Sequence, residues 1–283
     1  MAQYRKDTQQ FLNDCKTIFE VSMLGNSDGS VISNTNPIGV MTNNENILAA
    51  PWQLHAARGK IAGVSLQNIY GYNPNVGSAW VPIWENTTAY TFPSSSGETM
   101  VLYSSSASDT NVSVLINGLD NNYNIKSETL ILTNGTTGVN TVNSYMRINS
   151  MYITGTNNPV GNIILGNLGK TLIYAQINNG VGRTQMTIYT VPSGYTFYLD
   201  RVNISADGTA SGKAIYYRIS TINSNGIIGQ VVTSPFPTTY ETVRITPNPY
   251  PEKTTVQWQC SSPSQTVSIG LRIEGLLIQN SLL

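Results

Sequence analysis

The sequence predicts an all-β protein with two antiparallel β-sandwich (jelly-roll-like) domains and a short N-terminal helical arm. Many short segments alternate apolar and polar residues at period two, which is the pattern of strands with one buried face. Gly, Asn and Pro residues separate these segments at intervals of about ten residues. The chain leaves no room for the helical crossovers that a parallel sheet requires. We therefore expect antiparallel pairing.

The composition agrees with this fold and argues against nucleic-acid binding. The chain has 283 residues, of which 40% are hydrophobic, enough to build a substantial core. Only 11% are charged, against about a quarter in an average soluble domain. Its polarity comes mainly from Asn, Ser and Thr, which favour turns and strand surfaces. Fifteen basic and fifteen acidic residues cancel, so no basic surface is expected for nucleic acid.

Residues 1–50 are predicted to form an N-terminal arm and loop that anchor the protein. Five apolar residues recur at helical spacing and would share one face of a short helix: Phe11, Leu12, Cys15, Ile18 and Phe19. Two interpretations are open. The helix packs on its own domain, or these residues bind a neighbouring subunit.

The N-terminal segment is not predicted to target the chain to a membrane. Its charged residues are scattered and interrupt any continuous apolar core, so it does not read as a signal peptide. No run approaches the length of a membrane span. We expect the chain to fold in a cytoplasm.

Residues 51–156 are predicted to form the first sandwich. Turn-forming dipeptides such as Asn117-Gly118 and Asn134-Gly135 separate its expected strands. These strands are expected near residues 61–70, 79–85, 99–106, 111–117, 125–133 and 146–154.

Residues 157–283 are predicted to form the second sandwich. The segment GTNNPVG, residues 155–161, has the least regular pattern inside the chain and is the predicted domain boundary. Strands are expected near residues 162–167, 171–177, 184–191, 195–205, 213–222, 227–232, 241–246, 254–260 and 266–278.

The segment GLDNNYNIKSETLIL, residues 118–132, resembles part of a calcium-binding loop. Asp120, Asn122 and Asn124 stand at alternate positions, as oxygen ligands do in such loops. However, the sixth and twelfth positions hold Ile125 and Ile131, where an EF-hand needs Gly and a bidentate Glu. Asn and Asp also close tight turns without any ligand. The sequence therefore favours a turn and predicts no metal site.

The chain offers little for catalysis, and we expect neither an enzyme nor a cofactor. Its single histidine, His55, has no nucleophile motif or second metal ligand nearby, which favours a surface or interface position. The GNLGK segment at 166–170 lacks the spacing of a phosphate-binding loop. A glycosidase would need two carboxylates brought together by the fold. The carboxylates that stand singly on predicted strands and turns are Glu85, Glu98, Asp109, Asp120, Glu128, Asp200, Asp207, Glu241, Glu252 and Glu274.

Two cysteines lie near opposite ends of the sequence. Neither Cys15 nor Cys260 belongs to a CxxC motif. Spacing alone does not decide between a disulfide and two free or buried thiols, although the thiols are favoured.

Four aromatic residues are candidates for surface recognition: Trp80, Trp84, Tyr216 and Tyr217. Trp80 and Trp84 are four residues apart and would share one face of a strand. Such rings can stack on carbohydrate, but on strands they also fill cores and subunit interfaces. The core or interface interpretation is favoured.

Three segments carry a resemblance to a known family. They are GLDNNYNIKSETLILTNGTTGV (118–139), NSYMRINSMYITG (143–155) and YTVPSGYTFYLDRVNIS (189–205). Together they resemble virion structural proteins of tailed bacteriophages, notably marine ones. The similarity spans roughly residues 60–205 and includes no catalytic residue.

The resemblance implies a structural component of a virion, either a capsid decoration or fibre or a tail component. Its partners would be other virion proteins and further copies of itself, as a trimer or hexamer. It would reside in the virion after assembly in the host cytoplasm. The alternative is a module that binds a host-surface glycan or receptor, including a polysaccharide depolymerase.

Overall fold

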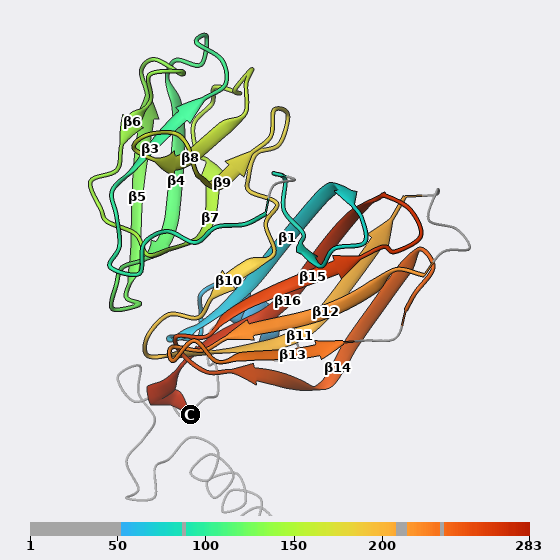
Figure 1. Ribbon diagram of the computed structural model, residues 1–283. Helices are drawn as coiled ribbons and strands as arrows, with labels where there is room; N and C mark the ends of the chain where they lie inside the picture. Colours follow the sequence, from blue (N-terminus) through green and yellow to red (C-terminus); the bar gives the residue numbers. More distant parts are fainter. Residues whose placement is uncertain (1–51, 87–88, 208–213, 233–234) are drawn as a thin grey trace, which may run out of the picture. The chain divides into compact units, whose positions relative to one another are not determined.

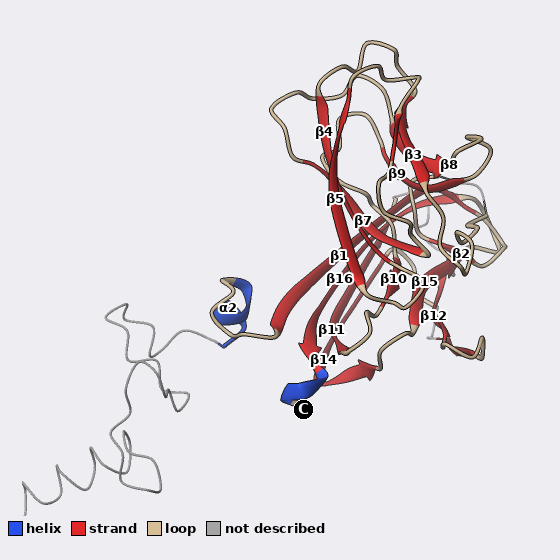
Figure 2. Cartoon of the chain, turned by 90° about the vertical axis from the view of Figure 1, so that its left-hand side faces the viewer, coloured by secondary structure: helices blue, strands red, loops and turns tan. Residues whose placement is uncertain are grey.

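A computed structural model describes residues 52–86, 89–207, 214–232 and 235–283 of the chain. Strands dominate these residues (Figures 1 and 2), and every strand pair assigned among them is antiparallel. They form two sandwiches within the compact unit Ala56–Leu283. The predicted all-β class is confirmed. The predicted arm and loop, residues 1–50, lie outside the described residues.

The first sandwich, which we call the base, combines strands from the beginning and the end of the described chain. One sheet has the order β1-β16-β11-β14, and the other has the order β10-β15-β12-β13 with β2 also pairing with β15. In Figure 1 blue β1 runs beside red β16. The strands are β1 (Val64–Val76), β2 (Val81–Pro82), β10 (Ile188–Thr190), β11 (Tyr195–Ala206), β12 (Tyr216–Ile222), β13 (Ile228–Val232), β14 (Thr239–Tyr250), β15 (Thr255–Ser261) and β16 (Val267–Gln279).

Strand β16 illustrates why these residues form a sheet with one buried face. Val267, Ile269 and Leu271 are at most 4% exposed and alternate with more accessible residues. Arg272 lies on the opposite, exposed face. Because β16 lies between β1 and β11, both of its edges are hydrogen-bonded. Alternation at period two therefore places one row of side chains in the core.

The second sandwich, which we call the insert, is formed by residues between β2 and β10. Its two sheets have the orders β6-β3-β8-β9 and β5-β4-β7. The strands are β3 (Met100–Ser104), β4 (Val112–Leu119), β5 (Ile125–Leu132), β6 (Val139–Asn140), β7 (Arg147–Ile153), β8 (Ile163–Asn167) and β9 (Ile173–Ile177).

The insert interrupts a single strand of the base. β2 and β10 both pair with β15, at neighbouring positions along it. Between them, the Thr187 hydroxyl accepts a hydrogen bond from the Ile83 N–H at 3.1 Å and donates to the Trp258 carbonyl at 2.8 Å. Counted as one strand, β2 and β10 complete two four-stranded sheets. This is the arrangement of a jelly roll.

Each sandwich has its own hydrophobic core. Trp258 and Phe197 belong to the core of the base, and Tyr145 and Met100 belong to that of the insert. A smaller cluster contains Trp84 and residues of the segments that connect the two sandwiches. The two large cores share no residue, so each sandwich buries its own apolar face.

The predicted division into residues 51–156 and 157–283 is wrong. Strands β1 and β2 pair with the last part of the chain, while β8 pairs with β3 inside the insert. The segment 155–161 connects β7 to β8, which belong to opposite sheets of one sandwich. A loop between two sheets has the same Gly, Asn and Pro content as a domain linker. Local sequence therefore does not distinguish them.

The turn interpretation of residues 120–124 is confirmed. These residues connect β4 to β5, which pair along their whole length. Asp120 Oδ1 accepts hydrogen bonds from the N–H groups of Asn122 and Asn124, both at 2.9 Å. Tyr123 has a φ of +63°, the left-handed backbone that such a turn requires. The Asp120 carboxylate thus accepts N–H groups of its own turn.

Replacing Asp120 by alanine is expected to lower the free energy of unfolding by about 1 kcal/mol, because two backbone N–H groups lose their acceptor. Urea denaturation measures this loss. Asn122→Ala is the control, since its backbone N–H is retained. Adding a chelator to the wild-type protein is expected to leave its melting temperature unchanged. A drop of several degrees would contradict the turn interpretation.

Helical structure is sparse in the described chain. It comprises α2 (Trp52–Ala57) and a 3-10 turn, η3 (Asn280–Leu282). His55, predicted at the surface or at an interface, is only 7% exposed in α2. Among the residues described, no helix has the length and apolarity needed to cross a membrane.

Candidate functional site

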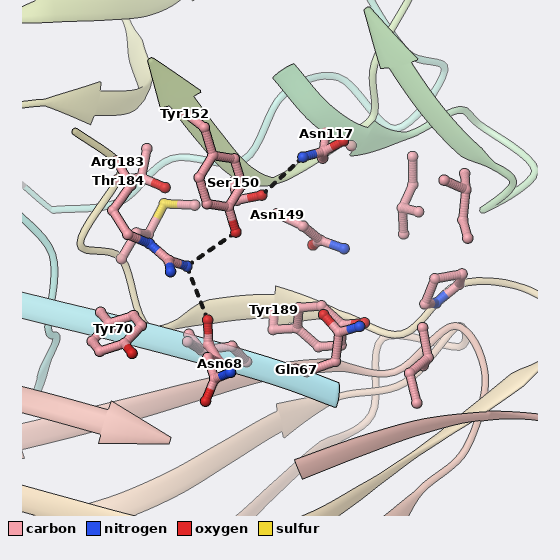
Figure 3. A pocket seen from close by; sticks show the side chains of 17 residues that line it. Gln67, Asn68, Tyr70, Asn117, Asn149, Ser150, Tyr152, Arg183, Thr184 and Tyr189 are labelled. Atoms are coloured by element: carbon pink, nitrogen blue, oxygen red, sulfur yellow. Dashed lines mark hydrogen bonds between the residues drawn. The ribbon is translucent and has the colours of Figure 1, made fainter. Parts of the chain in front are cut away.

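A cavity of about 230 Å³ is lined by residues of both sandwiches. Gln67, Asn68 and Tyr70 of β1 line it from the base. Asn117 of β4 and Tyr152 of β7 line it from the insert. Figure 3 shows these two groups on opposite sides of the cavity, with Arg183 at one end. The cavity therefore brings together polar side chains that are far apart in the sequence.

Arg183 is held in place by the two tyrosines at this end of the cavity. Its backbone forms an isolated antiparallel bridge with Tyr152 in β7. The guanidinium lies 4.5 Å from the ring centroid of Tyr70 and 4.7 Å from that of Tyr152. Its Nη2 donates to the Asn68 carbonyl at 2.9 Å and to the Tyr152 hydroxyl at 3.0 Å (Figure 3). These contacts fix a cation between two aromatic rings.

The described lining of the cavity carries one positive charge and no negative one. Among the described residues that line it, Arg183 alone has a charged side chain. Within the described chain no carboxylate forms an ion pair with Arg183, and its buried Nε has no hydrogen-bond acceptor. The cavity is therefore electropositive.

A second feature is the edge of the base formed by β13 and β14. Each is the last strand of its sheet. Ile228 and Val231 on β13 are 62% and 64% exposed, and Val243 and Ile245 on β14 are 54% and 102% exposed. Exposed β-branched residues thus lie on the last strand of each sheet of the base.

The space between these edge strands is an apolar groove of about 520 Å³. Ile219, Ile227 and Val231 line it from one sheet, and Tyr250 and Pro251 line it from the other side. Because the groove lies between the last strands of both sheets, it exposes the margin of the core to solvent.

The four candidate recognition aromatics do not form one surface. Trp84 and Tyr217 are 2% and 1% exposed, so the prediction of surface recognition is wrong for these two and the core interpretation holds. β2 ends at Pro82, so Trp80 and Trp84 do not share a strand. Trp80 is half-buried under Arg218, whose guanidinium lies 4.5 Å from its ring centroid. Tyr216 is half-buried on the face opposite Tyr217.

The structure describes Cys260 but not the predicted residues of the arm. Phe11, Leu12, Cys15, Ile18 and Phe19 all lie outside the described residues. Cys260 is a free, fully buried thiol in β15, and burial raises its pKa.

Several of the scattered carboxylates stabilise loops. Glu128 accepts hydrogen bonds from the N–H groups of Val142 and Asn143 at 2.9 and 3.1 Å. Asp109 accepts the N–H groups of Val160 and Gly161 at 2.7 and 3.0 Å. In the part of the chain that is described, His, Cys, Asp and Glu form no group of three able to hold a metal ion.

Neither Arg183 nor β13 was predicted from the sequence to have a functional role, although a strand was expected near residues 227–232. Arg183 lies in a Gly- and Asn-rich connection, where no local pattern distinguishes it from other arginines. For β13 a signal was present, because residues 227–232 form a strand-like run without a charge.

Comparisons with known proteins give weak structural similarities only. No family model matches the chain, and no curated protein does. A structure of infectious bursal disease virus, Gt strain, has 8% sequence identity and a TM-score of 0.24, covering 78% of this chain and 74% of that one. The crystal structure of the VP2 subviral particle of the same virus has 9% identity and a TM-score of 0.22, with coverages of 77% and 73%. Similarity at this level carries no argument about function.

Proposed function

We propose that this chain is a non-enzymatic structural protein of a tailed-phage virion. It would associate with copies of itself as a trimer or hexamer and with neighbouring virion proteins through its N-terminal arm. The observation that carries the self-association is the exposed apolar edge formed by β13 and β14.

Edge strands of monomeric proteins are normally protected against pairing by charges, prolines or bulges. β14 has such protection, because it contains Glu241, Arg244 and Pro247 and a break in its register with β11. β13, with the sequence IGQVV, contains neither a charged residue nor a proline. The outer backbone edge of β13, which pairs with no described strand, and its apolar side chains are therefore available to another chain.

A second copy of this protein is the occupant that we propose for the edge. A ring of three or six requires a heterologous contact, in which one surface of a copy meets a different surface of the next. The groove between β13 and β14 supplies an apolar concave side for such a contact. Filling it would cover the margin of the core.

The placement in a virion is supported by the resemblance of residues 118–139, 143–155 and 189–205 to phage structural proteins. The first two segments fall in the insert, and the third falls in the base. Jelly rolls also build viral capsid and lectin domains, an analogy of fold that agrees with this placement. Within a virion, the arm would attach the protein and the insert would be free for other contacts.

Introducing a charge at the edge tests the self-association. Val231→Lys is expected to convert the oligomer to monomer in analytical ultracentrifugation, because a lysine on an edge strand blocks pairing. Ile131→Lys is the matched control, since Ile131 is 52% exposed on β5, an edge strand of the insert that already contains Lys126 and Glu128. A monomeric wild-type protein, or equal effects of the two variants, would contradict the proposed interface.

Deleting residues 1–25 tests the anchoring separately. The truncated protein is expected to fold and to retain the strand signal in circular dichroism, but to lose binding to virions that lack the protein. Retained binding would refute the role of the arm.

A further inference from the structure

We propose that the cavity around Arg183 binds an acidic sugar residue, a pyranose ring that bears a carboxylate. This site would let the protein recognise an acidic polysaccharide. It differs from the aromatic recognition surface that the sequence offered as an alternative to a core or interface position, and it does not depend on the proposed oligomer.

The first step of the argument is the charge of Arg183. A half-buried guanidinium loses part of its hydration, and proteins usually compensate this loss with a carboxylate. No described carboxylate pairs with Arg183, and the two tyrosine rings supply only part of the compensation. An anionic ligand would complete it.

The second step is the hydrogen-bonding capacity of Arg183 that the protein leaves unused. Nη2 makes two bonds to protein atoms, whereas Nη1 makes none within the described chain and keeps some access to solvent. Nη1 can therefore donate two N–H groups to a ligand oxygen. Hydrogen bonds from a cation to a carboxylate are about twice as strong as those between neutral groups.

The third step concerns the neutral groups of β1. The side-chain amide of Asn68 and the hydroxyl of Tyr70 make no hydrogen bonds within the described chain, although both residues line the cavity. The Gln67 side chain donates to Ser65 Oγ at 3.0 Å, and its carbonyl oxygen accepts no hydrogen bond from the part of the chain that is described. In Figure 3 the three residues follow β1 along one side of the cavity; Gln67 extends from the face of β1 that carries Ile69, and Asn68 and Tyr70 extend from the opposite face. Amide and hydroxyl groups of this kind bind sugar hydroxyls.

The fourth step concerns the volume of the cavity and the polarity of its lining. Ile69, Leu119 and Met186 add apolar surface beside the polar groups. A pyranose requires both, because it has both apolar and polar surface. The volume of about 230 Å³ is below the range of about 300–1,000 Å³ that is usual for drug-sized ligands. The cavity therefore suits one ring. A single arginine matches one carboxylate rather than a multiply charged phosphate chain.

The test is calorimetric titration of the full-length protein with D-glucuronate, D-glucose and acetate. Glucuronate is expected to bind at least about tenfold more tightly than glucose, because only it engages Arg183. Acetate is expected to bind more weakly than glucuronate, because it lacks the hydroxyls. Equal affinities for glucuronate and acetate would reduce the site to an anion site and overturn the proposal.

Variants assign the binding to this cavity. Arg183→Gln is expected to lower glucuronate affinity at least about tenfold and to leave the weak glucose affinity unchanged. Arg218→Gln is the matched control, because Arg218 also stacks on an aromatic ring, that of Trp80, but does not line the cavity. If Arg183→Gln lowers the melting temperature and leaves glucuronate binding intact, Arg183 only connects the sandwiches and the proposal fails.

A second variant keeps the test decisive if Arg183→Gln does not fold. Asn68→Ala removes an amide that has no partner within the described residues, while the backbone carbonyl that holds Arg183 remains. It is expected to fold normally and to weaken glucuronate and glucose binding by similar factors. Unchanged affinity for both sugars would exclude this cavity. Neither result bears on the oligomer, which depends on Val231.

Discussion

Replacing Trp258 by alanine is expected to lower the free energy of unfolding by about 3–5 kcal/mol, the usual cost of removing a large aromatic side chain from a core. Trp258 is fully buried in the base sandwich. Its ring packs edge-on to that of Phe197, with centroids 6.3 Å apart. The neighbouring strands cannot close over so large a space, so a cavity would remain. Urea denaturation followed by circular dichroism measures the loss.

Trp80→Ala is the matched control. The Trp80 ring is only half-buried and contacts the Arg218 guanidinium, so its removal is expected to cost about 1 kcal/mol or less. Native-state hydrogen exchange adds a second readout, because Trp258 belongs to the core of the base alone. Amides of the base should lose protection before those of the insert. Equal losses for the two variants would contradict the assignment of Trp258 to the core.

The positions of the strands could be read from the sequence because the signals for a strand are local. Residues 195–205 and 266–278 were predicted as strands from their alternation, and the structure places β11 and β16 there. Turn residues also marked the ends of strands correctly, as Asp120 does between β4 and β5. Both signals depend on neighbours within about ten residues, a range that a single sequence contains.

The pairing of the strands could not be read in this way. Val64 pairs with Ile278, and nothing local to either residue specifies the other. For the same reason the insert could not be predicted, because its two connections to the base resemble ordinary loops. The sequence could therefore suggest two sandwiches but not that one interrupts a strand of the other.

The candidate sites depended on the same long-range information. Arg183 can be recognised as a site residue only from its contacts with Tyr70 of β1 and Tyr152 of β7, which are far from it in the sequence. For Tyr216 and Tyr217, the local sequence already limited which residue could be exposed. Adjacent strand residues point to opposite faces, so at most one of the two could belong to an exposed surface.

Glu85 is expected to make the stability of the protein depend on pH. The residue follows β2, is 5% exposed, and accepts a hydrogen bond from the Asn178 N–H at 3.4 Å. Burial raises the pKa of Glu85 from 4.5 to about 7, against the opposing effect of the backbone N–H groups of Gln185 and Asn178. Burial dominates because two hydrogen bonds replace only part of the lost hydration.

The direction of the pH dependence follows from the proton balance. Between pH 4.5 and about 7 the folded protein holds a proton on Glu85 that the unfolded chain has released. The folded state binds more protons in this window, so the free energy of unfolding falls as the pH rises through it. The loss from Glu85 amounts to about 3 kcal/mol above pH 7. Below pH 4.5 both states are protonated and the residue has no effect.

Glu85→Gln is expected to remove this pH dependence, because glutamine stays neutral at every pH. At pH 8 the variant should be more stable than the wild type by about 1–3 kcal/mol, since one lost hydrogen bond offsets part of the gain. Glu241→Gln is the control, because its side chain is 55% exposed and the slope should persist there. Urea denaturation at pH 5 and pH 8 gives both quantities. A wild-type stability that stays level between these two pH values, as in Glu85→Gln, would show that Glu85 is already ionised in the folded state at pH 5, and its contacts with the Asn178 and Gln185 amides would then outweigh its burial.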